Sequence, residues 1–431
     1  MLEILSHSSH FLPFLPPKRR REIRKTQLSF FDFSPHFQIS LSIEADFRKY
    51  LLSLMCKRSK ESDMDNLMRK LPIGIQTFED IRRKNYLYVD KTALVWRMAN
   101  LGKPYFLSRP RRFGKSLLLS TFESYFLGKK ELFEGLAIEQ METEWTEHPV
   151  LHLDLNAEKY DKPEKLNDIL SNHLTQWELQ YGKGLDEKTP SARFGGVIRR
   201  ACEQTGHQVV VLVDEYDKPL LQAITNLELL EEYRQSLKAF YGVLKSTDRY
   251  LRFVFLTGVT KFSQVSVFSD LNQLNDISLD YSYATLCGIT REELTATFKP
   301  EIETFGRKNH QTPEEVVTAM ERNYDGYHFH PDGDGVFNPF SVLNAFSKLE
   351  LGNYWFQTGT PTFLIELLQK SDYDLRTLLN GIEAPVSSFA EYRVDANNPI
   401  PLIYQSGYLT IKDYDREFQN YLLAFPNDEV R

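Results

Sequence analysis

The sequence is poor in cysteine, in long apolar runs and in positive charge. Its 431 residues include three cysteines, Cys56, Cys202 and Cys287, whose spacing is typical neither of a disulfide framework nor of a metal site. This usage favours a reducing cytosol. No apolar run approaches the ~20 residues that a bilayer-spanning helix needs, so no membrane segment is predicted. The net charge of -7 argues against a chain that coats nucleic acid by bulk charge alone.

The strongest local signal is the stretch Arg-Pro-Arg-Arg-Phe-Gly-Lys-Ser at residues 109–116. A short apolar run precedes it and apolar residues recur at helical spacing after it, which predicts a strand, a tight loop and a helix. Gly114 lets the backbone approach phosphates, and the amides and dipole of the helix start favour an anion. Lys115 can reach β/γ-phosphates, and the Ser116 hydroxyl can ligate Mg²⁺.

This motif alone leaves a second interpretation open. The usual phosphate loop has a glycine where this chain has Arg109, so a basic surface turn before an amphipathic helix explains the stretch equally well.

A second motif favours the phosphate site. Five apolar residues, 209–213, predict a strand buried on both faces, and the carboxylates of Asp214 and Glu215 follow directly. Ligands of parallel sheets lie at the carboxyl ends of strands, so both side chains are expected to face the phosphates. Asp214 would hold Mg²⁺, and Glu215 would orient and deprotonate the attacking water. Taken alone, the stretch also fits a buried strand that ends in a solvated acidic turn.

A third strand is predicted at residues 251–256, between the phosphate-loop strand and the acid strand of the sheet. This is the order of an additional-strand ATPase. Thr257, at its end, would hydrogen-bond the attacking water or the γ-phosphate. A simple strand-ending turn is the alternative for Thr257.

Four regions are predicted along the chain. Residues 1–70 are expected to be a disordered extension or a stretch translated from an early start, with Met64 as the natural beginning. Residues 71–285 form the ATPase core, 286–370 a helical lid, and 371–431 a small C-terminal α+β or winged unit. The lid contains two capping boxes, at Thr290 and Thr312. The fold class is therefore α/β, a three-layer αβα P-loop NTPase of the additional-strand AAA type with a parallel sheet.

With these motifs assembled, the chain resembles a family of bacteria and archaea, the AAA-ATPase-like domain proteins. The matching stretches are Tyr88–Thr92, Arg109–Ser116, Asp214–Pro219, Thr257–Phe262 and Tyr324–Tyr327. The family carries Arg-Pro-Arg-Arg-Phe-Gly-Lys-Ser as its phosphate loop, which accounts for Arg109. Its members typically continue, after a Pro-Asn-x-Glu-Val segment, into a PD-(D/E)XK nuclease-like domain. That domain is not seen here, where residues 426–430 match the segment, and no nuclease activity is expected.

The resulting hypothesis is a cytoplasmic, Mg²⁺-dependent protein that binds and hydrolyses ATP. The predicted catalytic residues are Lys115, Glu215, Thr257 and Arg112, the last as a candidate arginine in cis alongside Arg109 and Arg111. The predicted nucleotide contacts are Arg111, Arg112, Phe113, Gly114, Lys115, Ser116 and Leu117. The predicted metal ligands are Ser116 and Asp214.

The partners and the reaction class stay open. A DNA or protein partner is expected at the C-terminal unit, and an oligomer is compatible with the sequence. One alternative is a slowly hydrolysing, ATP-gated scaffold in a defence or mobile-element system. Another is a small-molecule phosphotransferase, although adjacent Asp and Glu after a long apolar strand suit water activation better.

Overall fold

The structure is a computed structural model that describes residues 69–431, apart from residues 103, 157, 262–266, 269–270, 272, 360, 370, 372 and 391–397. The chain divides into two compact units, residues 1–68 and 69–431. The predicted N-terminal extension therefore lies outside the described residues, except for Arg69 and Lys70, and so does Phe262 of the fourth matching stretch.

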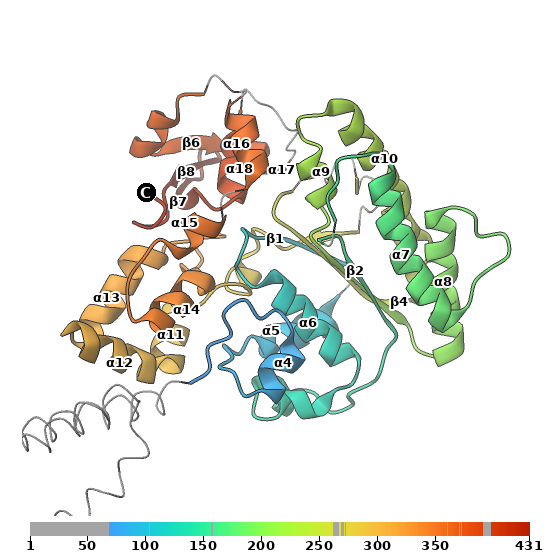
Figure 1. The fold of residues 1–431 in the computed structure, drawn as a ribbon, viewed down its shortest axis with the longest axis horizontal. Helices are drawn as coiled ribbons and strands as arrows, with labels where there is room; N and C mark the ends of the chain where they lie inside the picture. Colours follow the sequence, from blue (N-terminus) through green and yellow to red (C-terminus); the bar gives the residue numbers. More distant parts are fainter. Residues whose placement is uncertain are drawn as a thin grey trace, which may run out of the picture. The chain divides into compact units, whose positions relative to one another are not determined.

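A five-stranded parallel sheet forms the centre of the second unit (Figure 1). Its strands are β1 (Tyr105–Ser108), β2 (Val150–Asp154), β3 (Val209–Asp214), β4 (Leu251–Gly258) and β5 (Asn275–Asp276). Their order across the sheet is β2-β3-β4-β1-β5. The strand β4 thus separates the phosphate-loop strand from the acid strand, as predicted. Every residue of β3 is buried, in keeping with its unbroken apolar run.

Helices cover both faces of this sheet, as Figure 1 shows. One face carries α4 (Phe78–Arg83), α5 (Thr92–Leu101) and α6 (Lys115–Phe126). The other face carries α7 (Glu164–Tyr181), α8 (Pro190–Thr205), α9 (Lys218–Gln222) and α10 (Leu227–Ser246). The start of α8 illustrates how the sequence sets these bounds. The Thr189 hydroxyl accepts the Ala192 N–H, Pro190 occupies the first turn, and Gly206 ends the helix at φ 73°.

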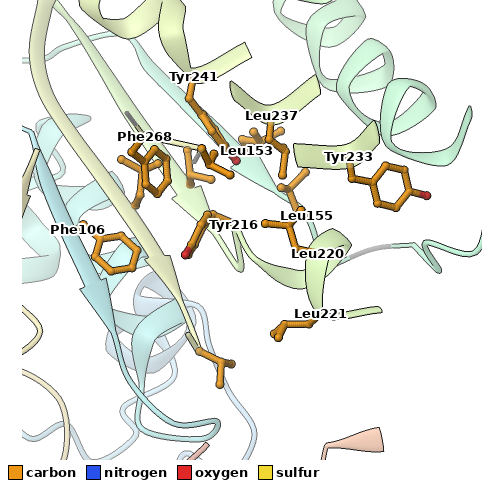
Figure 2. Packing of buried hydrophobic residues seen from close by; sticks show 14 of the residues in the cluster. Phe106, Leu153, Leu155, Tyr216, Leu220, Leu221, Tyr233, Leu237, Tyr241 and Phe268 are labelled. Carbon is orange, nitrogen blue, oxygen red and sulfur yellow. The ribbon is translucent and has the colours of Figure 1, made fainter. Parts of the chain in front are cut away.

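The core between the sheet and helices α7–α10 is rich in aromatic rings. Tyr216, just after β3, contacts Phe106 of β1 edge-on at 5.3 Å between ring centroids, and Phe268 at 5.1 Å. Tyr241 of α10 contacts Phe268 at 5.5 Å, and Figure 2 shows these side chains together with the surrounding leucines. This packing holds the end of β3 firmly against its neighbours in the sheet.

A helical unit follows the sheet. It consists of α11 (Arg291–Thr297), α12 (Lys299–Asn309), α13 (Pro313–Tyr324) and α14 (Pro339–Lys348). Both predicted capping boxes form, at Thr290 with Glu293 and at Thr312 with Glu315. The Asp-Gly-Asp-Gly stretch between α13 and α14 lies in a hairpin that an antiparallel bridge between Tyr327 and Val336 closes.

The C-terminal part is an α+β unit. Its helices are α15 (Tyr354–Gly359), α16 (Thr362–Gln369), α17 (Ser387–Ala390) and α18 (Ile400–Gln405). Its strands β6 (Ile382–Pro385), β7 (Thr410–Asp415) and β8 (Asn420–Ala424) form an antiparallel sheet in the order β6-β8-β7. Short 3-10 helices occur at Lys130–Phe133, Ala137–Gln140, Asp248–Tyr250, Tyr281–Tyr283 and Leu375–Asn380.

Residues 339–370 are mainly helical, in three separate helices, α14, α15 and α16. Leu349 ends α14 in the left-handed conformation at φ 53°, and Pro361 precedes α16. The apolar side of α16, including Leu364, joins the same core as Leu402 of α18. Among the described helices, none combines the length and apolar character needed to cross a membrane.

Candidate functional site

The loop between β1 and α6 contains two residues in the left-handed conformation. Gly114 caps α6 in the left-handed conformation at φ 93°, and Arg112 is also left-handed at φ 67°. A Cβ at Gly114 would meet open space, so it is the backbone angle that favours glycine here. Left-handed residues in a loop help to turn N–H groups toward one concave side, an arrangement that binds anions.

Lys115 lies buried at the centre of this loop. Its Nζ donates to the carbonyl oxygens of Arg109 at 3.0 Å and Pro110 at 3.3 Å, and it lies 3.4 Å from Oε1 of Glu215. The side chain is 4% exposed. The lysine of the loop and the second carboxylate of the acid strand therefore meet, as the sequence predicted. The amine is held by groups that a phosphate can replace.

Asp214 and Thr257 lie at the ends of the neighbouring strands β3 and β4. The Thr257 hydroxyl donates to Oδ1 of Asp214 at 2.8 Å, and both residues are buried. Glu215, the next residue, adopts φ 53°, which is uncommon for a residue with a side chain. Such backbone outliers concentrate at functional sites, where neighbouring contacts hold them in place. The strand ends thus bring Asp214, Glu215 and Thr257 to one edge of the sheet.

Asp217 is a functional candidate that the sequence analysis did not single out. It is fully buried and accepts hydrogen bonds from the Thr260 N–H at 2.6 Å, the Thr260 hydroxyl at 2.7 Å and the Val259 N–H at 3.1 Å. Burial, followed by the nearby charge of Glu215, raises the pKa of Asp217 to about 6. A Cβ at Gly258 would lie 2.6 Å from Oδ1 of Asp217. Asp217 therefore fixes the turn that follows Thr257. Only a glycine fits at position 258, because a larger residue would collide with Asp217.

The three arginines of the loop have different surroundings. The Arg109 guanidinium is buried and donates to the carbonyls of Ser108 at 2.9 Å, Ser278 at 2.8 Å and Tyr283 at 3.1 Å. Burial lowers the pKa of Arg109. These contacts give Arg109 a structural role.

Arg111 and Arg112 are the two arginines whose side chains reach the surface. Arg111 is partly exposed and lies 5.9 Å from the Phe363 ring. Arg112 is exposed and stacks over the Phe340 ring at 4.4 Å. Since Arg109 has a structural role, Arg111 and Arg112 remain as candidates for an arginine of the same chain that adds positive charge at the phosphates.

The other predicted contact residues divide between packing and the loop surface. Phe113 is buried, with its ring 4.8 Å from Tyr327 and 5.6 Å from Phe329. It anchors the loop on the Tyr324–Tyr327 motif. Ser116 is the second residue of α6 and is partly exposed.

An apolar hollow of about 100 Å³ adjoins the loop and contains both Gly114 and Leu117 in its wall. Other wall residues are Tyr88, Cys287, Ile289, Phe298 and Leu343. Lys91 also lies in the wall, where its amine contacts both carboxylate oxygens of Glu293 at 2.6 Å. The segment before the loop, helix α6 and the helical unit thus enclose an apolar space beside that loop.

Lys218 adds a second cation at this edge of the sheet. Its Nζ donates to the backbone and side-chain oxygens of Asn156, which follows β2, the latter at 2.7 Å. Burial lowers the pKa of Lys218. The sequence signal was the place of Lys218 in the Asp214–Pro219 stretch, but its partner Asn156 lies 62 residues away and could not be inferred.

The donors for a metal are few. Among the residues that the structure describes, no three His, Cys, Asp or Glu side chains gather closely enough to hold an ion. This is compatible with Mg²⁺, which usually binds one or two protein oxygens and completes its shell with water and substrate phosphates. Asp214 supplies a carboxylate, of which one oxygen already accepts from Thr257, and Ser116 supplies a hydroxyl. The donor set therefore fits a nucleotide-bound Mg²⁺ rather than a resident metal.

The sheet order and the loop define the class of the protein. A parallel sheet with the phosphate loop after β1, carboxylates after β3, and β4 between these strands is the α/β fold of P-loop NTPases. Residues 72–268 match the family described as predicted AAA-ATPase. The chain belongs to this family, which confirms the resemblance noted from the motifs.

Two similar proteins were found by comparison. An uncharacterised protein in the vnfD 5' region of Azotobacter chroococcum mcd 1 is 41% identical over 367 residues, which cover 84% of this chain and 68% of that protein. The structure of the Aeropyrum pernix ORC2 protein, in ADPNP–ADP complexes, aligns over 80% of this chain and 92% of that chain, with 11% identity and a TM-score of 0.30. The family assignment rests on the sequence matches.

Proposed function

We propose that this protein binds ATP with Mg²⁺ at the carboxyl edge of its parallel sheet and hydrolyses it. The observation that carries the proposal is the meeting of Lys115 and Glu215, 3.4 Å apart, beside the hydrogen-bonded pair of Thr257 and Asp214. Phosphate groups need cations and amide donors, and water attack on them needs a base. These groups converge here from three different strand ends.

In the proposed mechanism, the phosphates replace the present partners of Lys115. The amine leaves the carbonyls of Arg109 and Pro110 and binds the β- and γ-phosphates, while the loop amides around Gly114 donate to the same oxygens. Ser116 and Asp214 would hold Mg²⁺, which neutralises phosphate charge in the transition state. Arg111 or Arg112 adds a further positive charge there.

Glu215 acts as the base in this mechanism. In the present arrangement its carboxylate lies against the Lys115 amine, so the movement of Lys115 to the phosphates frees Glu215 to orient and deprotonate water. Thr257 would sense the γ-phosphate, and its hydroxyl bond to Asp214 links that contact to the metal ligand.

The apolar hollow beside Gly114 supports a place for the base of the nucleotide. Its wall joins the loop, α6 and the helical unit, and aromatic and aliphatic side chains there suit a flat ring. A base seated in the hollow would connect the sheet to the helical unit. Through this connection the nucleotide state would reach a partner protein or DNA at the C-terminal unit.

A slowly hydrolysing, ATP-gated scaffold in a defence or mobile-element system is the second candidate. The Lys115–Glu215 contact favours slow turnover, since the base is paired until a phosphate displaces the amine. Tight ATP binding with phosphate release at background level would support this candidate over the ATPase.

The test uses the full chain with Mg²⁺ and ATP, measuring equilibrium binding and phosphate release, with and without DNA. We expect Glu215→Gln to bind ATP like the wild type but to release phosphate roughly 10²–10⁴-fold more slowly, as for loss of a general base. Glu314→Gln, which makes the same change on a side chain that is 79% exposed, serves as the control. Unchanged turnover in Glu215→Gln would remove that residue from its role, and a wild type that binds no ATP would refute the proposal.

A further inference from the structure

The outer side of the phosphate loop is held by the C-terminal part of the chain. The indole N–H of Trp355, in α15, donates to the backbone carbonyl of Arg111 at 3.0 Å, across 244 residues of sequence. Trp355 is 0% exposed. Gly407 also packs on the loop, because a Cβ there would lie 2.8 Å from Cβ of Pro110. Two separate segments of the C-terminal part therefore contact the first half of the loop.

Trp355 is itself held by a buried carboxylate, Glu429. One oxygen of Glu429 accepts the Trp355 backbone N–H at 2.7 Å, and the other accepts the Ser341 hydroxyl at 2.8 Å. Glu429 is 4% exposed, and burial raises its pKa. Two residues earlier, the Asn427 amide donates to the Asp325 carbonyl at 2.8 Å. The segment 426–430 is thus fastened to the helical unit on one side and to Trp355 on the other.

The bond to Arg111 fixes one peptide group of the loop. In a trans peptide, the C=O of one residue and the N–H of the next point in opposite directions. Because the Arg111 carbonyl points at Trp355, the Arg112 N–H points away from Trp355. Arg112 is left-handed at φ 67°, a conformation that needs support from neighbours in a residue with a side chain. The indole N–H supplies that support from outside the loop.

We infer that Trp355 is a positioning residue for nucleotide binding, which orients the Arg111–Arg112 peptide so that its N–H donates to phosphate, and that Glu429 holds Trp355 in place. This inference rests on the proposed nucleotide function. Nucleotide occupancy of the loop and the position of segment 426–430 are then coupled through one tryptophan. Preorganised amides bind an anion more tightly than amides that must first turn toward it.

A purely structural role for Trp355 makes a different prediction. Its ring lies 5.2 Å from Tyr408 and 6.5 Å from Tyr327, so the indole also fills space. Trp355→Phe keeps an aromatic ring but loses the N–H. A packing role would lower thermal stability without changing nucleotide affinity in the folded protein. A positioning role would change the affinity itself.

The experiment measures the dissociation constant for Mg-ADP and the KM and kcat for ATP in the full chain. We expect Trp355→Phe to bind ADP roughly 2- to 10-fold more weakly, as for loss of one hydrogen bond, and to raise KM by a similar factor with kcat little changed. Trp145→Phe is the matched control. The Trp145 indole nitrogen is buried and has no hydrogen-bond partner in the part of the chain that the structure describes.

A second pair of variants tests the same inference without altering the tryptophan. Glu429→Gln keeps an oxygen for the Trp355 N–H and should bind ADP within about twofold of the wild type, whereas Glu429→Ala should resemble Trp355→Phe. If Trp355→Phe does not fold, the ADP affinities of Glu429→Gln and Glu429→Ala, compared with each other, decide between the positioning role and the packing role. Equal affinity in the wild type and in folded Trp355→Phe, or in Glu429→Ala and Glu429→Gln, would overturn the inference. A wild type that binds no ADP or ATP would instead refute the proposed function.

Discussion

Two groups of buried and partly buried charges in this protein are built differently. Between α7 and α8, Arg193 contacts both oxygens of Glu178 at 2.7 and 2.8 Å, and Arg200 contacts both oxygens of Glu187 at 2.6 and 3.0 Å. The hydrogen bond from Arg193 is the main cause of the lowered pKa of Glu178. These charges are matched in pairs, and nothing further is needed to stabilise them.

Lys115 and Asp217, near the carboxyl edge of the sheet, are not matched in this way. The Lys115 amine hydrogen-bonds to two carbonyls and has its carboxylate only at 3.4 Å. Burial raises the pKa of Asp217 rather than lowering it. Closely paired ions indicate a structural role, whereas loosely paired ions beside a loop with left-handed residues indicate a site that a charged ligand completes. The following variants test this distinction.

The largest effect is expected at the loop lysine. Lys115→Ala removes the cation that binds the phosphates, and ATP affinity should fall by at least about 100-fold, since hydrogen bonds between charged groups are the strong ones. The measurement is equilibrium ATP binding, with exposed Lys84→Ala as the control. Retained affinity in Lys115→Ala would place the lysine among the structural charges.

A smaller effect is expected at Thr257. Thr257→Val keeps the shape of the side chain but leaves Oδ1 of Asp214 without its hydroxyl donor, so the rate of phosphate release should fall about tenfold. Thr257→Ser keeps the hydroxyl and should stay close to the wild type. Equal rates in the valine and serine variants would contradict a role for the hydroxyl.

The matched pair between α7 and α8 should affect stability alone. Arg193→Met leaves the buried Glu178 carboxylate unpaired, which should lower the free energy of unfolding by roughly 1–3 kcal/mol. Thermal denaturation measures this loss. The KM for ATP and the rate of phosphate release per folded molecule should not change. A change in either would contradict a purely structural role for the Arg193–Glu178 pair.

The smallest expected effect is a pH dependence at Asp217. Its pKa is about 6 in the folded chain against 3.8 for the ordinary group, so its contribution to stability is full below pH 3.8 and is lost as the pH rises through 6. Asp217→Asn cannot ionise. The melting temperature of this variant relative to the wild type should therefore rise by a few degrees between pH 4 and pH 7. A constant difference across this range would mean that Asp217 does not titrate as described.

Much of the fold could be predicted because its signals are local. The apolar run 209–213, the capping residue Thr290 and the Gly-Lys-Ser ending of the loop each act on their own neighbours in sequence. The end of α14 has no such local signal, because Leu349 ends this helix in a conformation that leucine seldom adopts.

The candidate site was predictable only in part. Lys115, Asp214 and Glu215 stand in recognisable motifs, so sequence reasoning found them. Asp217 and Trp355 depend on partners that lie 43 and 244 residues away, and no spacing rule reveals such contacts. The carbonyl partners of Arg109 were equally hidden, although the residue itself belongs to the motif.

Arg109 has a mechanical consequence for the loop. Its guanidinium ties the end of β1 to Ser278, just past β5, and to Tyr283, and its face rests 3.9 Å from the Phe329 ring. A glycine at this position would leave the loop free to bend where it leaves the strand. Here the bend is blocked, and any opening or closing of the loop must pivot beyond residue 109, in the few residues that Trp355 and Tyr327 contact from outside.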